Sequence, residues 1–197
     1  MMNLPNKLTV VRMFLVPVFL LFISVEAIPY GFTIATIVFA IAAYTDHLDG
    51  KIARRDNLVT NFGKFMDPLA DKLLVTAALV ALVDHELIAA WVVVVIIARE
   101  FAVSGLRTIA ANEGVVIAAS MWGKIKTTTQ IIAIISLLIK LISTKEEYMI
   151  SFFNSVPFLE SFFNIFPPVM MYVAVFFTIM SGVDYFKNGW AYIDSNK

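Results

Sequence analysis

Two neighbouring stretches decide the fold of this chain: TDHLDGKIAR at residues 45–54 and NFGKFMDPLAD at residues 61–71. The first closes an apolar run that begins near residue 29, and the second opens an apolar run that ends near residue 83. Runs of this length suit helices that cross a bilayer, whose apolar core takes about 20 helical residues. The two stretches therefore predict the polar turn between two membrane helices.

The composition of the whole chain agrees with a membrane protein. Of its 197 residues, 60% are hydrophobic and 15% are charged, and the mean hydropathy is +0.84. These values exclude a water-soluble domain with a single core. The 15 Lys and Arg balance the 15 Asp and Glu, so no nucleic-acid partner is expected, and the lack of Cys excludes thiol chemistry.

Six apolar segments account for almost the whole sequence. The predicted spans are residues 8–25, 29–53, 67–83, 87–108, 121–142 and 166–185. We therefore expect one domain over residues 1–197, an all-α integral membrane protein with six transmembrane helices. Between residues 148 and 168, the phenylalanines and two Pro-containing breaks predict a segment that lies along the outer surface or forms a loop.

The charged residues of these segments lie at alternating ends, which share one side of the membrane in an alternating topology. Because ionisable groups are costly in lipid, this predicts a polar cavity on that side and a dry opposite face. Thirteen of the 15 Lys and Arg belong to that side, all except Lys140 and Lys145. The positive-inside rule then places both termini and the cavity opening in the cytoplasm.

Four aspartates in the two deciding stretches form a candidate metal site. Asp46 and Asp49 are spaced i, i+3, and Asp67 and Asp71 are spaced i, i+4, so each pair projects from one face of its helix. Carboxylates that converge near a low-dielectric region repel one another unless cations neutralise them. Oxygen ligands without Cys favour Mg²⁺ or Mn²⁺, and two ions about 3.5–4 Å apart would suit displacement at phosphorus. The alternative is a set of solvated helix ends.

The same stretches contain further residues of interest. Gly50 and Gly63 each leave room for close approach to the backbone, although Gly63 could equally serve helix packing. His47 lies off the carboxylate face, so packing or a lipid-headgroup contact suits it better than a ligand role. Pro68 fits the first turn of a helix, or a kink if the helix begins near residue 61.

From residue 46 to residue 71 the sequence reads D-x2-D-G-x2-A-R-x8-G-x3-D-x3-D. This pattern resembles the signature of the CDP-alcohol phosphatidyltransferase family. The stretches that resemble its bacterial phosphatidylglycerophosphate synthase branch are residues 4–12, 98–107, 123–127 and 181–186. The resemblance covers nearly the full chain and is weakest between residues 140 and 168.

The resemblance implies an enzyme of a bacterial cytoplasmic membrane, with its active site facing the cytoplasm. It implies transfer of the phosphatidyl group of CDP-diacylglycerol to sn-glycerol 3-phosphate, which gives phosphatidylglycerophosphate and CMP. It also implies a homodimer and two metal ions, Mg²⁺ or Mn²⁺, in each active site. The implied metal ligands are Asp46, Asp49, Asp67 and Asp71, with Asp71 also acting as the general base. The implied CDP-diacylglycerol contacts are Gly50, Arg54 and Gly63; Asn6, Thr9 and Thr45 are either further contacts or helix caps and packed hydroxyls.

Glycerol 3-phosphate is a dianion, so a site for it should be cationic. Arg99 and Arg107 share one face of the fourth segment, and Lys124 opens the fifth on the same side. We expect these three residues to bind the acceptor phosphate, with Lys126 as the alternative to Lys124. Glu100 should pair with one of these cations or face the loop. The alternative role for the cations is anchoring at the membrane surface or contact with anionic lipid.

Other functions are open at this point. One is the same reaction with inositol phosphate, serine or phosphatidylglycerol as acceptor; another is divalent-cation transport. A transporter would place carboxylates near the bilayer midplane, whereas these lie at helix ends on one side. A structural scaffold would not need four converging acids. Trp91 with residues 92–97 is a candidate dimer surface, which lipid contact explains equally well.

Overall fold

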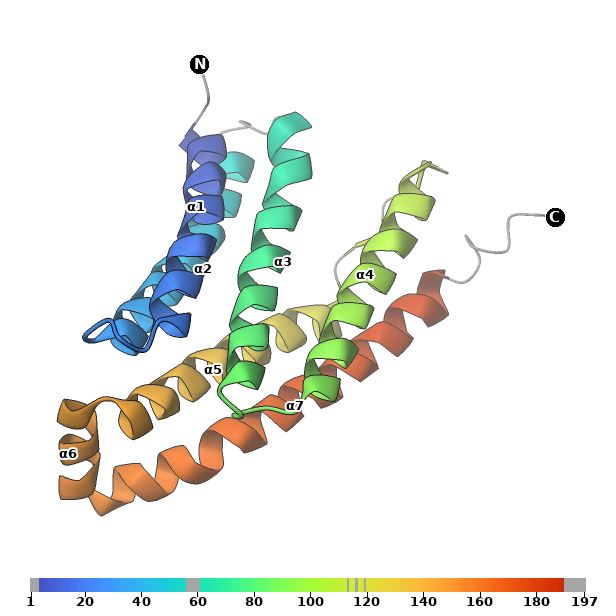
Figure 1. The fold of residues 1–197 in the computed structure, drawn as a ribbon. Coiled ribbons are helices and arrows are strands. Elements are labelled where there is room, and N and C mark those ends of the chain that lie inside the picture. Colours follow the sequence, from blue (N-terminus) through green and yellow to red (C-terminus); the bar gives the residue numbers. More distant parts are fainter. Residues whose placement is uncertain (1–3, 56–60, 113, 116, 119, 190–197) are drawn as a thin grey trace.

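The computed structural model describes residues 4–55, 61–112, 114–115, 117–118 and 120–189, without the side chains of residues 4–5, 46–55, 61–62, 64–65 and 112. All regular secondary structure in these ranges is helical, which confirms the all-α class. The helices are α1 (Leu4–Ser24), α2 (Gly31–Arg55), α3 (Asn61–Asp84), α4 (Ala90–Asn112), α5 (Met121–Lys145), α6 (Glu147–Ser155) and α7 (Pro157–Gly189) (Figure 1).

Within the part of the chain that the structure describes, three helices are long and apolar enough to cross a membrane: α1 over residues 6–24, α5 and α7. The described apolar part of α2, Gly31–Thr45, is shorter. These helices indicate an integral membrane protein. The number of spans and the side on which the termini lie stay predictions.

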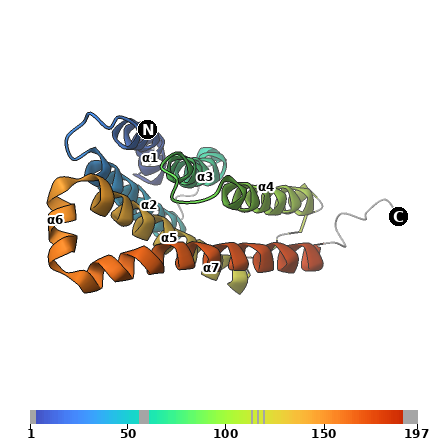
Figure 2. The same ribbon diagram turned by 60° about the horizontal axis from the view of Figure 1, so that its bottom comes forward.

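The helices pack in two connected groups. α1 packs on α2 and α3, and α5 packs along α7, with α6 joining these two long helices at one edge of the molecule (Figure 1). Figure 2 shows α7 running the length of one side. One buried apolar cluster connects the groups and includes Phe19, Phe39, Leu79, Leu137 and Ala174. This cluster holds the inner faces of α1 to α5 and α7 together.

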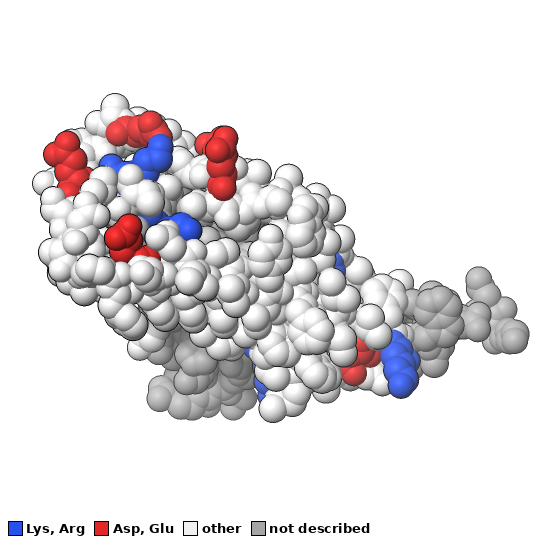
Figure 3. All heavy atoms as spheres, turned by 90° about the horizontal axis from the view of Figure 1, so that it is seen from below, with Lys and Arg blue, Asp and Glu red and all other residues white. Residues whose placement is uncertain are grey.

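The side of the molecule with the α1–α2 and α3–α4 connections is the predicted outer side. Seen from that side, most of the surface carries neither Lys and Arg nor Asp and Glu (Figure 3). The charged side chains visible there gather toward the two ends of the molecule. The surface on this side of the molecule is therefore largely uncharged.

Helices α3 and α7 begin earlier in the sequence than predicted. α3 begins at Asn61, so Pro68 lies inside the helix rather than in its first turn. The segment between residues 148 and 168 is helical, with its break at Pro157 as expected. Pro167 and Pro168, in contrast, lie inside α7 and do not interrupt it, so the second expected break is wrong.

A lysine on α5 compensates for a proline in α7. A proline in a helix leaves the carbonyl four residues earlier without its usual N–H donor. For Pro168 that carbonyl belongs to Asn164, and Lys140 Nζ donates to it across 3.3 Å. The contact supplies a donor from another helix, which helps α7 to continue through its prolines.

The corner between α5 and α6 is tied to the start of α2. The Glu146 carboxylate accepts the backbone N–H of Thr33 at 3.0 Å and its hydroxyl at 2.6 Å. Glu146 is buried, and the Tyr148 hydroxyl is hydrogen-bonded to the same threonine. The first N–H groups of a helix lack partners within it, so Glu146 caps α2 from a distant part of the chain.

The candidate dimer surface at residues 91–97 is partly exposed, with Trp91 and Val94 on its exposed side. Val92, Val93 and Ile96 are buried in the core, because one face of α4 packs against the rest of the protein. Trp91 is exposed on one side, and its ring stacks on Tyr172 of α7 with 6.3 Å between ring centroids. The homodimer itself stays a prediction.

Candidate active site

A polar cavity of about 490 Å³ opens between α3, α4, α5 and α7. It lies where the N-terminal parts of α3 and α5 meet the C-terminal parts of α4 and α7. The polar residues at its wall include Asp71, Lys72, Arg99, Arg107, Lys124 and Tyr185. The structure therefore brings Asp71 together with all three cations expected to bind the acceptor phosphate.

Both arginines of α4 are anchored to α7. Arg99 donates through Nη2 to the Ser181 hydroxyl and through Nη1 to Glu100 Oε1, the latter at 3.2 Å. Arg107 donates through Nη2 to the Tyr185 hydroxyl at 2.6 Å. These contacts place the two guanidinium groups at the same cavity, two helical turns apart along α4.

The two lysines at the start of α5 have different surroundings. Lys126 is buried, 4% exposed, and its ammonium group donates to Glu100. Lys124 is exposed and lines the polar cavity. The expected pairing of Glu100 with a cation is confirmed, and Lys124 rather than Lys126 is free to meet a ligand in the polar cavity.

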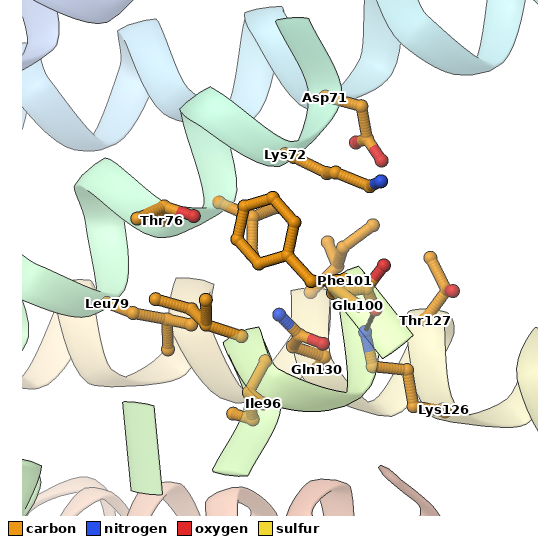
Figure 4. A pocket seen from close by; sticks show the side chains of 13 residues that line it. Asp71, Lys72, Thr76, Leu79, Ile96, Glu100, Phe101, Lys126, Thr127 and Gln130 are labelled. Atoms are coloured by element: carbon orange, nitrogen blue, oxygen red, sulfur yellow. Dashed lines mark hydrogen bonds and ion pairs between the residues drawn. The ribbon is translucent and has the colours of Figure 1, made fainter. Parts of the chain in front are cut away.

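A narrower cavity of about 70 Å³ continues from the polar one between α3, α4 and α5 (Figure 4). Asp71, Lys72 and Glu100 line both cavities, whereas Leu79 and Ile96 line the far part of the narrow one. Lys72 donates to the Ser104 hydroxyl of α4, which joins the two helices beside the cavities. The share of apolar residues in the lining thus increases from the polar cavity to the narrow one.

Two of the four aspartates have described side chains. Asp67 is half-buried and accepts a hydrogen bond from the hydroxyl of Thr9 on α1, which is fully buried. Asp71, one turn further along α3, lines the polar cavity. The Thr9 contact orients the Asp67 carboxylate between two helices.

The side chains of Asp46, Asp49 and Arg54 lie outside the described residues. The same holds for His47 and for the surroundings of Gly50. The helix that carries them, α2, extends to Arg55, and its end lies at the same end of the molecule as the start of α3 (Figure 1). Gly63 is buried in α3. The backbone thus brings both deciding stretches to one end of the molecule.

The described side chains contain no cluster of three or more acids or histidines that could hold a metal. The donors that are described fit a hard cation: the carboxylate of Asp67 is held by a neighbouring hydroxyl, and that of Asp71 faces a polar cavity.

The other polar candidates from the sequence have mixed outcomes. Thr45 donates to the carbonyl of Ala42 in its own helix at 2.9 Å, which is the packed-hydroxyl alternative. Asn6 is buried in α1. Ser181 and Tyr185 were not expected individually as site residues; the available signals were the family resemblance of residues 181–186 and the polarity of the two residues within an otherwise apolar helix.

Comparison with known proteins shows the family of the chain. A family model described as CDP-alcohol phosphatidyltransferase matches residues 2–183. The chain therefore belongs to the CDP-alcohol phosphatidyltransferase family.

Individual relatives narrow the similarity to one branch. The CDP-diacylglycerol–glycerol-3-phosphate 3-phosphatidyltransferase of Bacillus subtilis is 48% identical, over 96% of each chain. The protein of that name from Rickettsia bellii is 36% identical, over 94% of each chain. A probable phosphatidylglycerophosphate synthase of Mycobacterium tuberculosis is 37% identical, over 93% of this chain and 79% of the relative.

Proposed function

We propose that this protein transfers the phosphatidyl group of CDP-diacylglycerol to sn-glycerol 3-phosphate, which gives phosphatidylglycerophosphate and CMP. The observation that carries the proposal is the convergence of Arg99, Arg107 and Lys124 with Asp71 around one cavity. The printed names of the relatives from Bacillus subtilis and Rickettsia bellii state the same reaction.

The three cations suit an acceptor that carries a phosphate. A guanidinium group can donate two parallel hydrogen bonds to phosphate oxygens, and an ammonium group adds a compact positive charge. Serine has no phosphate group, so as the acceptor it would offer no phosphate oxygens to Arg99, Arg107 and Lys124. Inositol phosphate would meet them too, and the names of the relatives favour glycerol 3-phosphate over it.

Asp46, Asp49, Asp67 and Asp71 would hold the two metal ions, Mg²⁺ or Mn²⁺. When bound, such ions neutralise phosphate charge and stabilise the negative charge on the leaving CMP. Gly50, Arg54 and Gly63 would line the cytidine diphosphate part of the site. These assignments are supported by the spacing of the residues and by the backbone placement of α2 and α3.

Asp71 is the proposed general base. Its carboxylate accepts the proton of the acceptor hydroxyl as that oxygen attacks the β-phosphorus of CDP-diacylglycerol. A phosphorus–oxygen bond forms to the acceptor, the bond to the CMP oxygen breaks, and CMP leaves with the electron pair. Asp71 then returns its proton to water in the cavity. No phosphatidyl-enzyme intermediate is involved, so the configuration at phosphorus is inverted.

We also propose that the protein is one domain of six spans in the cytoplasmic membrane, with both termini and the cavity facing the cytoplasm. In this arrangement the acyl chains stay in the bilayer while the soluble acceptor enters from water. We propose a homodimer with one active site in each protomer.

The test measures CMP release by the purified protein with CDP-diacylglycerol and Mg²⁺. Glycerol 3-phosphate, inositol phosphate, serine and phosphatidylglycerol are offered separately. We expect turnover with glycerol 3-phosphate and its loss in Asp71→Asn, whereas Asp84→Asn at the other end of α3 stays active. Turnover with another acceptor alone would disprove the acceptor assignment, and an active Asp71→Asn would disprove the base.

A further inference from the structure

Tyr185 is a buried aromatic residue on a largely exposed stretch of α7. It is 3% exposed, whereas its neighbours Val183 and Phe186 are 59% and 36% exposed. The ring therefore points inward, to the wall of the polar cavity. A residue in this place can organise the cavity from the side of α7.

The hydroxyl of Tyr185 accepts two hydrogen bonds from different helices or their caps. One comes from Arg107 Nη2 at 2.6 Å, and the other from the backbone N–H of Ser120 at 3.0 Å. Ser120 is the N-cap of α5, and its own hydroxyl accepts the N–H of Gly123. The tyrosine thus links Arg107 to the start of the helix that carries Lys124.

The ring of Tyr185 contacts both arginines. The Cζ atoms of Arg99 and Arg107 lie 5.4 Å and 5.0 Å from the ring centroid. The electron-rich face of an aromatic ring attracts cations at this range. A single ring therefore holds two like charges near each other, which would otherwise repel.

Helix α5 approaches this ring at Gly123. A Cβ atom at Gly123 would lie 3.4 Å from Tyr185 Cε2 and 3.6 Å from Arg99 Nη2. Ser181, one turn before Tyr185 on α7, accepts a hydrogen bond from the same Arg99 nitrogen. Arg99 therefore lies between α5 and α7 and is held to α7 by this hydrogen bond.

We propose that Tyr185 is a positioning residue for the acceptor site: it holds Arg99 and Arg107 at the wall of one cavity, where both can bind the same phosphate dianion. The inference rests on the proposed function, because the phosphate is that of the acceptor. Tyr185 acts through the arginines, so it governs the binding of the phosphorylated acceptor rather than that of CDP-diacylglycerol.

The experiment compares steady-state kinetics of the full-length protein and its variants. Tyr185→Phe retains the ring and removes the hydroxyl, so the KM for glycerol 3-phosphate should rise about tenfold, as expected for the loss of a hydrogen bond to a charged group. The kcat and the KM for CDP-diacylglycerol should stay within about twofold of wild type, because Tyr185 acts on the binding of the acceptor alone. Tyr172→Phe, an exposed tyrosine on the same helix, is the control and should leave all constants unchanged.

Ser181→Ala releases only Arg99 and gives an independent second variant, also expected to raise the KM for glycerol 3-phosphate alone. An unchanged KM for glycerol 3-phosphate in Tyr185→Phe would overturn the inference, whatever Ser181→Ala does. An equal rise in both KM values would also overturn it, since it would indicate a general structural effect. A wild type that releases no CMP with glycerol 3-phosphate would instead overturn the proposed function, and this inference with it.

Discussion

The individual residues of the site are held mainly by contacts between helices. Thr9 on α1 donates to Asp67 on α3, and Lys126 on α5 donates to Glu100 on α4. Each contact holds a carboxylate in one orientation. A carboxylate at a helix end in water would rotate between several orientations. Orientation of this kind is what separates a binding site from a set of charged helix ends.

The Thr9 contact yields a prediction about metal dependence. If Asp67 is a metal ligand, Thr9→Val removes the hydroxyl that orients it and should raise the Mg²⁺ concentration for half-maximal activity about tenfold, the lower end of the range for such partners. Titration of Mg²⁺ into metal-stripped protein measures the effect. Thr9→Ser keeps the hydroxyl and should behave as wild type. An identical Mg²⁺ requirement in Thr9→Val would show that the contact has no part in metal binding.

At the scale of the helices, two glycines differ in the space that packing leaves for a side chain. A Cβ atom at Gly31, the first residue of α2, would lie 2.8 Å from the carbonyl oxygen of Phe22 in α1, so this position has no room for a side chain. Nothing lies within 4 Å of the corresponding position at Gly105 in α4.

These two glycines predict opposite effects on stability. Gly31→Ala forces the backbone apart and should lower the free energy of unfolding by about 1–3 kcal/mol. Gly105→Ala should raise it by up to about 1 kcal/mol, because alanine favours the helix. Thermal unfolding in detergent measures both. Equal unfolding temperatures for the two variants would contradict the packing described for α1 and α2.

The contact between α5 and α7 predicts an energetic coupling. Lys140→Met removes the donor to the Asn164 carbonyl and should cost about 1 kcal/mol. Pro168→Ala supplies an N–H in α7 for the same carbonyl, so Lys140→Met should cost less in that background. A double-mutant cycle of unfolding free energies measures the coupling. Additive effects of the two substitutions would mean that lysine and proline act independently.

At the scale of the whole molecule, the predicted orientation can be tested by labelling. It places the helix ends that line the cavity in the cytoplasm and the opposite helix ends outside. The chain contains no Cys, so single substitutions report on one position each. We expect a membrane-impermeant thiol reagent added outside intact cells to label Glu26→Cys and Glu147→Cys, both at exposed positions. Lys7→Cys and Lys187→Cys should be labelled only after the membrane is opened. The reverse pattern would show that the cavity faces outward.

The sequence by itself determined the class of the protein and the approximate positions of α1 to α5. Long apolar segments form helices in a bilayer, because lipid offers no hydrogen-bond partners and a helix satisfies its own backbone N–H and C=O groups. The predicted run at 121–142 corresponds to α5, and the spacing from Asp46 to Asp71 predicts the family on its own. Charge at alternating helix ends was enough to expect Arg99, Arg107 and Asp71 at one cavity.

Only the tertiary structure decided which polar side chains meet. Lys124 and Lys126 are alike in the sequence, yet burial pairs Lys126 with Glu100 and leaves Lys124 at the cavity. Tyr185 reaches two arginines 78 and 86 positions earlier in the chain. Such contacts depend on the rotation of each helix about its axis, which is determined by the packing of the whole core rather than by local periodicity.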